Sequence, residues 1–151
     1  MVKKSEIMKK PKVFGVYGKS NSGKTSLIVQ IIKHLTKNGY KIATVKISDK
    51  DINLDSKGKD TWMHSKAGSN LTVLSSKNET GYLLKQYKDT EEILKSIALL
   101  DNYDLVLIEG ANDNTTKKIR LGNIKKRSNT ILTFDGDFEK LIKIIQNEIM
   151  R

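Results

Sequence analysis

Cysteine is absent from this 151-residue chain, and proline occurs only once. The lack of cysteine excludes disulfide bonds and thiolate metal sites, and it fits a reducing compartment, so we expect a cytoplasmic protein. No run of apolar residues approaches the roughly 18 that a membrane-spanning helix needs. The basic segment 1–10 is not followed by the apolar core of a signal peptide. The sequence therefore predicts no membrane association.

Acidic residues are scarce relative to basic ones: 17 Asp and Glu stand against 28 Lys and Arg, for a net charge of +11. This excess favours contact with polyanions. The lysines are scattered rather than gathered in blocks, and no aromatic-basic nucleic-acid motif is present, so we do not expect a nucleic-acid partner. The basic segment ending at the only proline predicts an N-terminal tail over residues 1–11, and the length predicts a single compact domain over residues 12–151.

Apolar residues form short runs that alternate with helical faces. Strands over 12–17 and 41–46 flank a helix over 25–38, which is a βαβ unit and implies a parallel sheet. The remaining expected strands are 71–74, 81–87, 104–109, 119–124 and 130–134, and the remaining helices are 60–66, 90–100 and 138–149. This order predicts an α/β, three-layer fold with a mostly parallel central sheet, helices on both faces and an antiparallel edge. The glycine-bounded loop over residues 18–25, set between a strand and a helix, makes this the P-loop NTPase fold.

The loop after the first strand matches the pattern G-x-x-x-x-G-K-[ST] at every fixed position. In such a loop, successive backbone N–H groups and the positive end of the following helix bind phosphate oxygens. Lys24 would reach the β- and γ-phosphates as a catalytic residue, and Thr25 would offer its hydroxyl to Mg²⁺. The predicted nucleotide-binding residues of this loop are Gly18, Lys19, Ser20, Asn21, Ser22, Gly23, Lys24, Thr25 and Ser26.

Glu109 ends the most apolar strand of the chain, which resembles a Walker B strand. A carboxylate at the C-terminal end of a central parallel strand lies beside the phosphate-binding loop, where it can hold Mg²⁺. Asp104 begins the same strand and so lies at the wrong end. Asp51 stands in the polar loop after the second strand. Because hard oxygen ligands suit Mg²⁺, we predict Thr25, Asp51 and Glu109 as its ligands.

Lys19 directly follows the first glycine of the loop. This position resembles the signature lysine of the SIMIBI class of NTPases, in which two subunits face each other and the lysine reaches the partner's nucleotide. The resemblance implies a catalytic role for Lys19 and a homodimer. The extra glycines that are usual in that class are replaced here by Ser20 and Asn21.

The segment 51–68 resembles a distinctive stretch of the molybdopterin-guanine dinucleotide biosynthesis adapter family, MobB. Alternating acids are followed by Gly58-Lys-Asp-Thr61, then by His64, then by Ala67-Gly68. The family's D-L-V-L-[VI]-E-G strand and its P-K-[IV] segment resemble residues 104–110 and 117–119, and the resemblance covers residues 12 to about 146. The family's histidine-rich patch is replaced by residues 47–49, and its aromatic and lysine after the glycine by residues 111–112.

By this resemblance, the chain is a GTP-binding adapter that assists the conversion of molybdopterin to molybdopterin guanine dinucleotide. A MobA-like guanylyltransferase and molybdenum or tungsten enzymes would be its partners, and Asp60 and His64 would join the nucleotide-binding residues. Guanine is implied by the family alone, because no N-K-x-D motif is present. No arginine finger or water-positioning glutamine is evident, which predicts at most slow, Mg²⁺-dependent GTP hydrolysis.

Two other functions remain open on the sequence alone. A P-loop small-molecule kinase would carry an arginine-bearing lid over the phosphates. The chain has three arginines, and Arg127 in the basic loop 125–127 is the candidate for that lid. The second alternative is a non-enzymatic polyanion binder that uses the net charge of +11.

Overall fold

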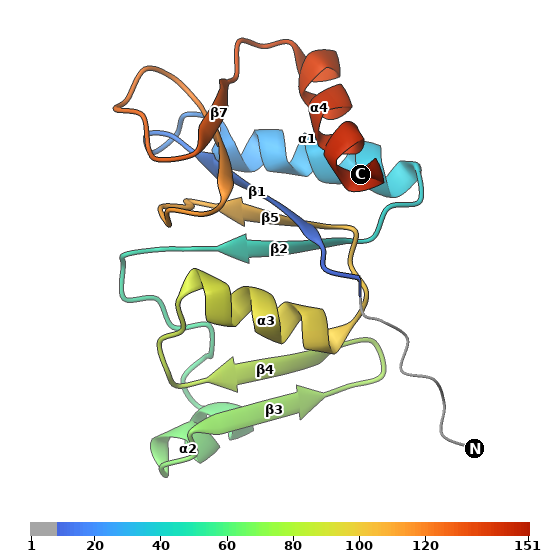
Figure 1. The fold of residues 1–151 in the computed structure, drawn as a ribbon. Helices are drawn as coiled ribbons and strands as arrows, with labels where there is room; N and C mark the ends of the chain where they lie inside the picture. The colour runs from blue at the N-terminus through green and yellow to red at the C-terminus, as the bar shows by residue number, and fades with distance from the viewer. Residues whose placement is uncertain (1–8) are drawn as a thin grey trace, which may run out of the picture. The chain divides into compact units, whose positions relative to one another are not determined.

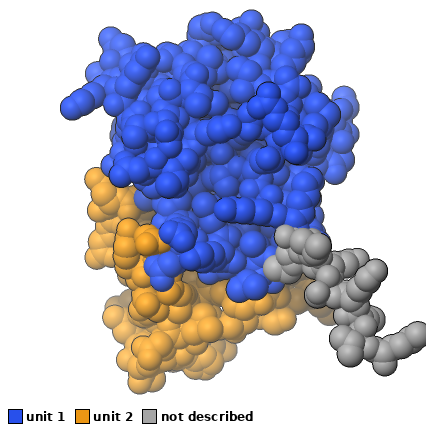
Figure 2. Space-filling model, viewed as in Figure 1, with its two compact units in different colours: residues 1–47, 90–151 blue, residues 48–89 orange. Residues whose placement is uncertain are grey.

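A computed structural model describes residues 9–151, so most of the predicted basic tail over 1–11 lies outside the described residues. The chain divides into two compact units (Figure 2). We call Met1–Ile47 with Thr90–Arg151 the sheet unit and Ser48–Asp89 the hairpin unit. That residues 12–151 act as a single nucleotide-binding domain stays a prediction.

The sheet unit is built on five parallel strands in the order β2-β5-β1-β6-β7 (Figure 1). Because β1 is central and the chain continues first to one side of it and later to the other, the loop after β1 lies at a topological switch point, where ligands bind in such sheets. The elements are β1 (Lys12–Tyr17), α1 (Lys24–Lys37), β2 (Ile42–Lys46), α3 (Thr90–Leu100), β5 (Leu105–Glu109), β6 (Lys117–Arg120), β7 (Thr130–Thr133) and α4 (Phe138–Met150).

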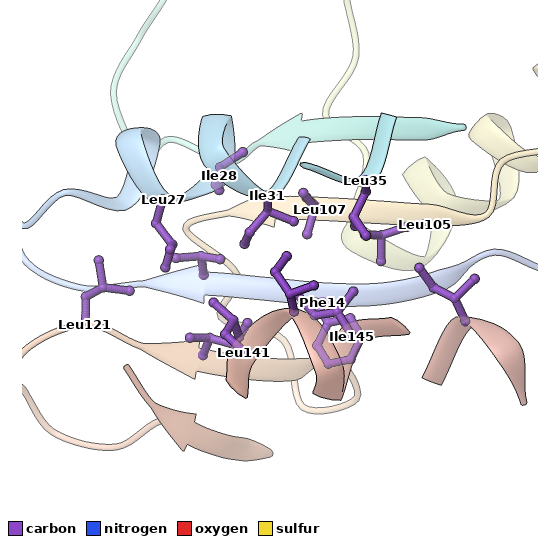
Figure 3. Packing of buried hydrophobic residues seen from close by; sticks show 14 residues of the cluster. Phe14, Leu27, Ile28, Ile31, Leu35, Leu105, Leu107, Leu121, Leu141 and Ile145 are labelled. Atoms are coloured by element: carbon purple, nitrogen blue, oxygen red, sulfur yellow. The ribbon is translucent and has the colours of Figure 1, made fainter. Parts of the chain in front are cut away.

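Helices cover both faces of this sheet, as predicted. Alternate apolar residues of β1 and β5, among them Phe14 and Leu107, pack with α1 and α4 in the main core (Figure 3). The other residues of β5, Val106 and Ile108, pack with Leu94 and Ile97, which belong to α3. Each fully buried side chain of this kind stabilises the fold by about 1.5–3 kcal/mol. The two clusters therefore fix the sheet in the middle of three layers.

Helix α1 begins and ends where glycines allow the chain to turn. It starts after Gly23, whose φ is 89°, and it ends before Gly39, whose φ is 84°. The carbonyl oxygen of Leu35 accepts from the backbone N–H groups of Asn38 and Tyr40, which confirms the predicted C-terminal stop. Leu27, Ile28, Ile31 and Leu35 form the buried face of the helix.

The hairpin unit contains α2 (Asp60–Lys66) and two antiparallel strands, β3 (Leu71–Ser75) and β4 (Thr80–Leu84). These strands form a two-stranded sheet of their own, so the predicted antiparallel pair exists but is not an edge of the central sheet. The register pairs Leu71 with Leu84 and Val73 with Tyr82, which places all four side chains on one face. All four are exposed, so the hairpin carries an apolar surface.

Strand β6 differs from its prediction. The sequence pattern favours a strand over residues 119–124, whereas the strand spans Lys117–Arg120. The physical reason is that Lys118 is fully buried and begins the strand with Lys117, although two lysines are typical of a solvated loop. Across residues 9–151, none of the helices combines the length and the apolar character that crossing a membrane would require.

Candidate nucleotide-binding site

The loop Gly18–Gly23 makes a tight bend between β1 and α1. A Cβ atom at Gly18 would lie 2.6 Å from Ser22 Oγ and 3.0 Å from the carbonyl oxygen of Leu121, so a larger residue would force the loop open. Within the bend, Ser22 N–H donates to the carbonyl oxygen of Lys19 at 3.2 Å. The loop leads directly into the N-terminus of α1, whose free N–H groups and dipole favour an anion.

Lys24 is the first residue of α1, and its ammonium group folds back over the loop. Its Nζ donates to the carbonyl oxygen of Gly18 at 3.1 Å and to that of Lys19 at 2.5 Å. Ser22 Oγ is buried without a hydrogen-bond partner among the described residues, which is unusual for a hydroxyl. The loop thus combines a positive charge with a buried polar atom that can still form a hydrogen bond, as a phosphate site requires.

Thr25 and Glu109 meet at the C-terminal edge of the sheet. The hydroxyl of Thr25 donates to both carboxylate oxygens of Glu109, at 3.0 and 3.1 Å. A hydroxyl and a carboxylate together form a hard-oxygen donor set that fits Mg²⁺, which takes one or two protein carboxylates and completes its shell with phosphates and water. Within the described part of the chain, no group of three or more His, Cys, Asp or Glu side chains is placed to hold a metal. The pair therefore suits Mg²⁺ held jointly with a phosphate ligand.

Asp104 lies at the wrong end of the strand for the site, as its place in the sequence indicates, and Glu109 as a metal ligand stays a prediction. Asp104 precedes β5 at the opposite edge of the sheet, where its Oδ2 accepts from the backbone N–H of Lys41 at 2.8 Å. Its carboxylate therefore joins β2 to β5 at the end of the strands that carries no phosphate-binding loop.

Four other predicted nucleotide ligands of the loop are exposed to solvent. They are Lys19, Ser20, Asn21 and Ser26, and Asn21 adopts a φ of 58°. The remaining predicted residues belong to the hairpin unit, where Asp60 is the first residue of α2 and His64 lies in its last turn; Asp51 precedes that helix. The participation of these three residues in the site stays a prediction, as does the role of Lys19.

Arg127 is held against the sheet unit rather than placed on a free lid. Its guanidinium lies 4.7 Å from the ring centroid of Tyr17, and its Nη1 donates to the carbonyl oxygen of Ala111 at 2.7 Å. Its backbone N–H donates to the hydroxyl of Tyr17 at 3.0 Å. Because these contacts tie the loop before β7 to the ends of β1 and β5, the structure does not favour the kinase alternative.

Lys118 joins the loop between β5 and β6 to the loop before β7. Its buried Nζ donates to the carbonyl oxygens of Asp113, Thr116 and Ser128 at 2.5, 2.9 and 3.0 Å. Burial acts to raise the pKa of the Asp113 carboxyl, but hydrogen bonds from the backbone N–H groups of Thr116 and Thr115, and from threonine hydroxyls, outweigh it and lower that pKa to about 2. Asp113 therefore remains ionised in neutral solution and fixes the turn that precedes β6.

Lys46 is a residue of the site that sequence reasoning did not select. It is the last residue of β2 and stands in register with Glu109. Its Nζ lies 4.0 Å from Glu109 Oε1, the oxygen that also accepts from Thr25. The sequence did show that Lys46 ends a strand. It did not show which strand lies next to β2, and this had to be known to place Lys46 beside Glu109.

A model of the family described as molybdopterin guanine dinucleotide synthesis protein B matches residues 13–147. A putative molybdopterin-guanine dinucleotide biosynthesis adapter protein of Methanocaldococcus jannaschii is 42% identical over 99 residues, which are 66% of this chain and 40% of that protein. The adapter protein of Escherichia coli is 31% identical over 106 residues, which are 68% of this chain and 60% of that protein. The chain thus aligns with less than two thirds of the length of these relatives.

Solved structures of this family share the fold. Bacillus subtilis MobB superposes with a TM-score of 0.73 at 20% identity, covering 91% of this chain and 97% of that one. A MobB homologue from Bacillus stearothermophilus gives a TM-score of 0.66, also at 20% identity, with coverages of 91% and 97%. At this identity the likeness concerns the fold alone. The family match over residues 13–147 decides the assignment: the chain belongs to the MobB family of molybdopterin guanine dinucleotide synthesis proteins.

Proposed function

We propose that this chain binds GTP together with Mg²⁺ and acts as an adapter in the conversion of molybdopterin to molybdopterin guanine dinucleotide. The proposal that the chain binds a nucleotide rests on one observation. The hydroxyl of Thr25 is hydrogen-bonded to the carboxylate of Glu109, next to a loop over which the ammonium group of Lys24 folds back. Few sites other than a phosphate site combine a glycine-bounded bend, a helix N-terminus, an ammonium group and a hard-oxygen pair.

Each part of the loop has a distinct role in this proposal. Backbone N–H groups of residues 18–26 bind the phosphate oxygens, and Lys24 exchanges its two carbonyl partners for phosphate oxygens. Thr25 and Glu109 would hold Mg²⁺, which would neutralise phosphate charge when bound. Asp51, Asp60, His64 and Lys19 are proposed as further contacts.

The adapter role rests on the family. The relatives in Escherichia coli and Haemophilus influenzae are named molybdopterin-guanine dinucleotide biosynthesis adapter proteins. We extend to this chain a MobA-like guanylyltransferase and molybdenum or tungsten enzymes as partners, and a homodimer as the assembly. The exposed apolar face of β3 and β4 supports a protein contact, since contiguous apolar surface commonly marks interaction sites.

Calorimetric titration tests the nucleotide proposal. Wild-type protein should bind GTP more tightly than ATP in the presence of Mg²⁺, and Lys24→Ala should weaken GTP binding by about tenfold to a hundredfold, because a charge-assisted contact is lost. Lys33→Ala is the matched control, since Lys33 is an exposed residue of the same helix. Equal affinity for GTP and ATP would remove the guanine claim, and an unchanged affinity of Lys24→Ala would remove the loop from the site.

Hydrolysis should be slow. Neither an arginine finger nor a water-positioning glutamine is evident in the sequence, so we expect GTP turnover well below about one per second, in the range of unaided GTPases. Release of inorganic phosphate with and without Mg²⁺ measures this directly. Faster turnover would contradict the prediction of slow hydrolysis, and phosphate transfer to an added small acceptor would favour the kinase alternative.

A further inference from the structure

Lys46 lies beside the proposed metal pair without an evident structural task. Its side chain is 68% exposed, whereas that of Glu109 is 16% exposed, and the charged atoms are 4.0 Å apart. An exposed ion pair at this separation contributes about 0–1 kcal/mol to folding. The stability of the sheet therefore does not explain why a lysine ends β2.

The position of Lys46 is fixed by the sheet. In register, Lys46 of β2 and Glu109 of β5 are neighbours on the same face, because side chains of adjacent parallel strands at one register position point to the same side. The backbone N–H of Ile47 donates to the carbonyl oxygen of Glu109 at 3.0 Å, which extends this pairing beyond Lys46. The backbone at Lys46 is therefore held by its pairing with β5, while its ammonium group can move on a flexible stem.

The oxygen that Lys46 approaches is shared. Glu109 Oε1 lies 3.0 Å from Thr25 Oγ1 and 4.0 Å from Lys46 Nζ. A Mg²⁺ ion bound by Thr25 and Glu109 would neutralise the carboxylate that Lys46 now pairs with. The ammonium group of Lys46 would then be free to pair with another anion. In P-loop sites the metal is held together with the terminal phosphates of the nucleotide, so a terminal phosphate group would supply that anion.

We propose that Lys46 binds the terminal phosphate of a nucleoside triphosphate and makes the site distinguish triphosphate from diphosphate. The inference rests on the proposed function and deepens it, because it adds a second lysine that reaches the site from β2 rather than from the loop. Lys24 would reach the β-phosphate, which both ligands possess, as well as the γ-phosphate, whereas Lys46 would contact only the phosphate that the triphosphate alone possesses.

Calorimetry with Mg·GTP and Mg·GDP tests this inference on wild type, Lys46→Met, Lys46→Arg and Lys37→Met. Lys46→Met should weaken GTP binding by about tenfold, as expected for one lost charge-assisted contact, and GDP binding by less than about threefold. Lys46→Arg should keep most of the preference for GTP. Lys37→Met removes the same charge from the exposed C-terminal end of α1, away from the loop, and should leave both affinities within about twofold of wild type.

The outcomes separate this inference from the proposed function. Wild type that binds neither GTP nor ATP overturns both. Wild type that binds GTP and ATP equally removes only the guanine claim, and the same comparison is then made with ATP and ADP. Nucleotide binding by wild type together with equal losses for triphosphate and diphosphate in Lys46→Met, or with no loss, overturns the role of Lys46 alone. Thermal unfolding of Lys46→Met should match wild type, because the side chain is exposed.

Discussion

Replacing Lys118 with methionine is expected to lower the free energy of unfolding by about 2–4 kcal/mol, because three carbonyl groups, one buried and two partly buried, lose their donor. The side chain of Lys118 is 0% exposed, and its Nζ serves three carbonyl oxygens from two loops. Methionine fills a similar volume, so the loss reports on the hydrogen bonds more than on a cavity. Urea denaturation followed by far-UV circular dichroism measures the change.

The neighbouring residue provides the control for this prediction. Lys117 is exposed and pairs with Glu148 on α4 at 2.8 Å, so Lys117→Met should cost no more than about 1 kcal/mol. The two variants remove the same charge from adjacent positions of one strand. Losses of equal size would show that the three carbonyl contacts of Lys118 do not stabilise the fold.

The burial of Lys118 and the start of β6 could not be predicted from the sequence. A strand that begins with two lysines has no apolar signal at its start, and the prediction places it two residues late, at Ile119. What makes the burial of Lys118 possible is the convergence of carbonyl groups from Asp113, Thr116 and Ser128. Since one of these lies ten residues away in another loop, the local pattern could not reveal the arrangement.

The central residues of the candidate site could be predicted from the sequence, because the patterns that indicate them involve residues close together in the chain. The glycine pattern fixes the bend, and the apolar face over residues 27–35 fixes the helix that follows it. Glu109 could be chosen over Asp104 because the direction of a parallel strand decides which end faces the loop. These inferences needed no knowledge of strand order.

The residues that contact Glu109 and Tyr17 could not be predicted without the order of the strands. Lys46 meets Glu109 only because β2 pairs with β5, and Arg127 reaches Tyr17 only because the loop before β7 returns to the end of β1. Similarly, the antiparallel strands are recognisable as strands, but their separation from the central sheet depends on pairing that residue patterns do not encode. Sequence thus predicted the elements and the loop, while the contacts between distant elements required the fold.

Replacing Gly110 with alanine is the second change for which we expect a large loss of stability. Gly110 follows Glu109 with a φ of 87°, and a Cβ atom there would lie 2.8 Å from the carbonyl oxygen of Ile47. That oxygen belongs to backbone held in place by the bond from Ile47 N–H to the carbonyl oxygen of Glu109, so it cannot withdraw easily. Gly110→Ala should therefore lower the free energy of unfolding by about 2–4 kcal/mol, from backbone strain and overpacking together.

Gly39→Ala separates these two causes. Gly39 has a similar φ of 84°, but nothing lies within 4 Å of the place that a Cβ atom would occupy, so alanine there should cost only the conformational term of about 1 kcal/mol. A second measurement addresses the site: relief of the clash at Gly110 must move the backbone next to Glu109, which should raise the Mg²⁺ concentration needed for tight GTP binding, while Gly39→Ala should leave it unchanged. Equal destabilisation of the two variants would mean that the backbone at Ile47, which directly follows β2, can move away from the added methyl group, and the pairing that aligns Lys46 with Glu109 would then be less firm than the structure implies.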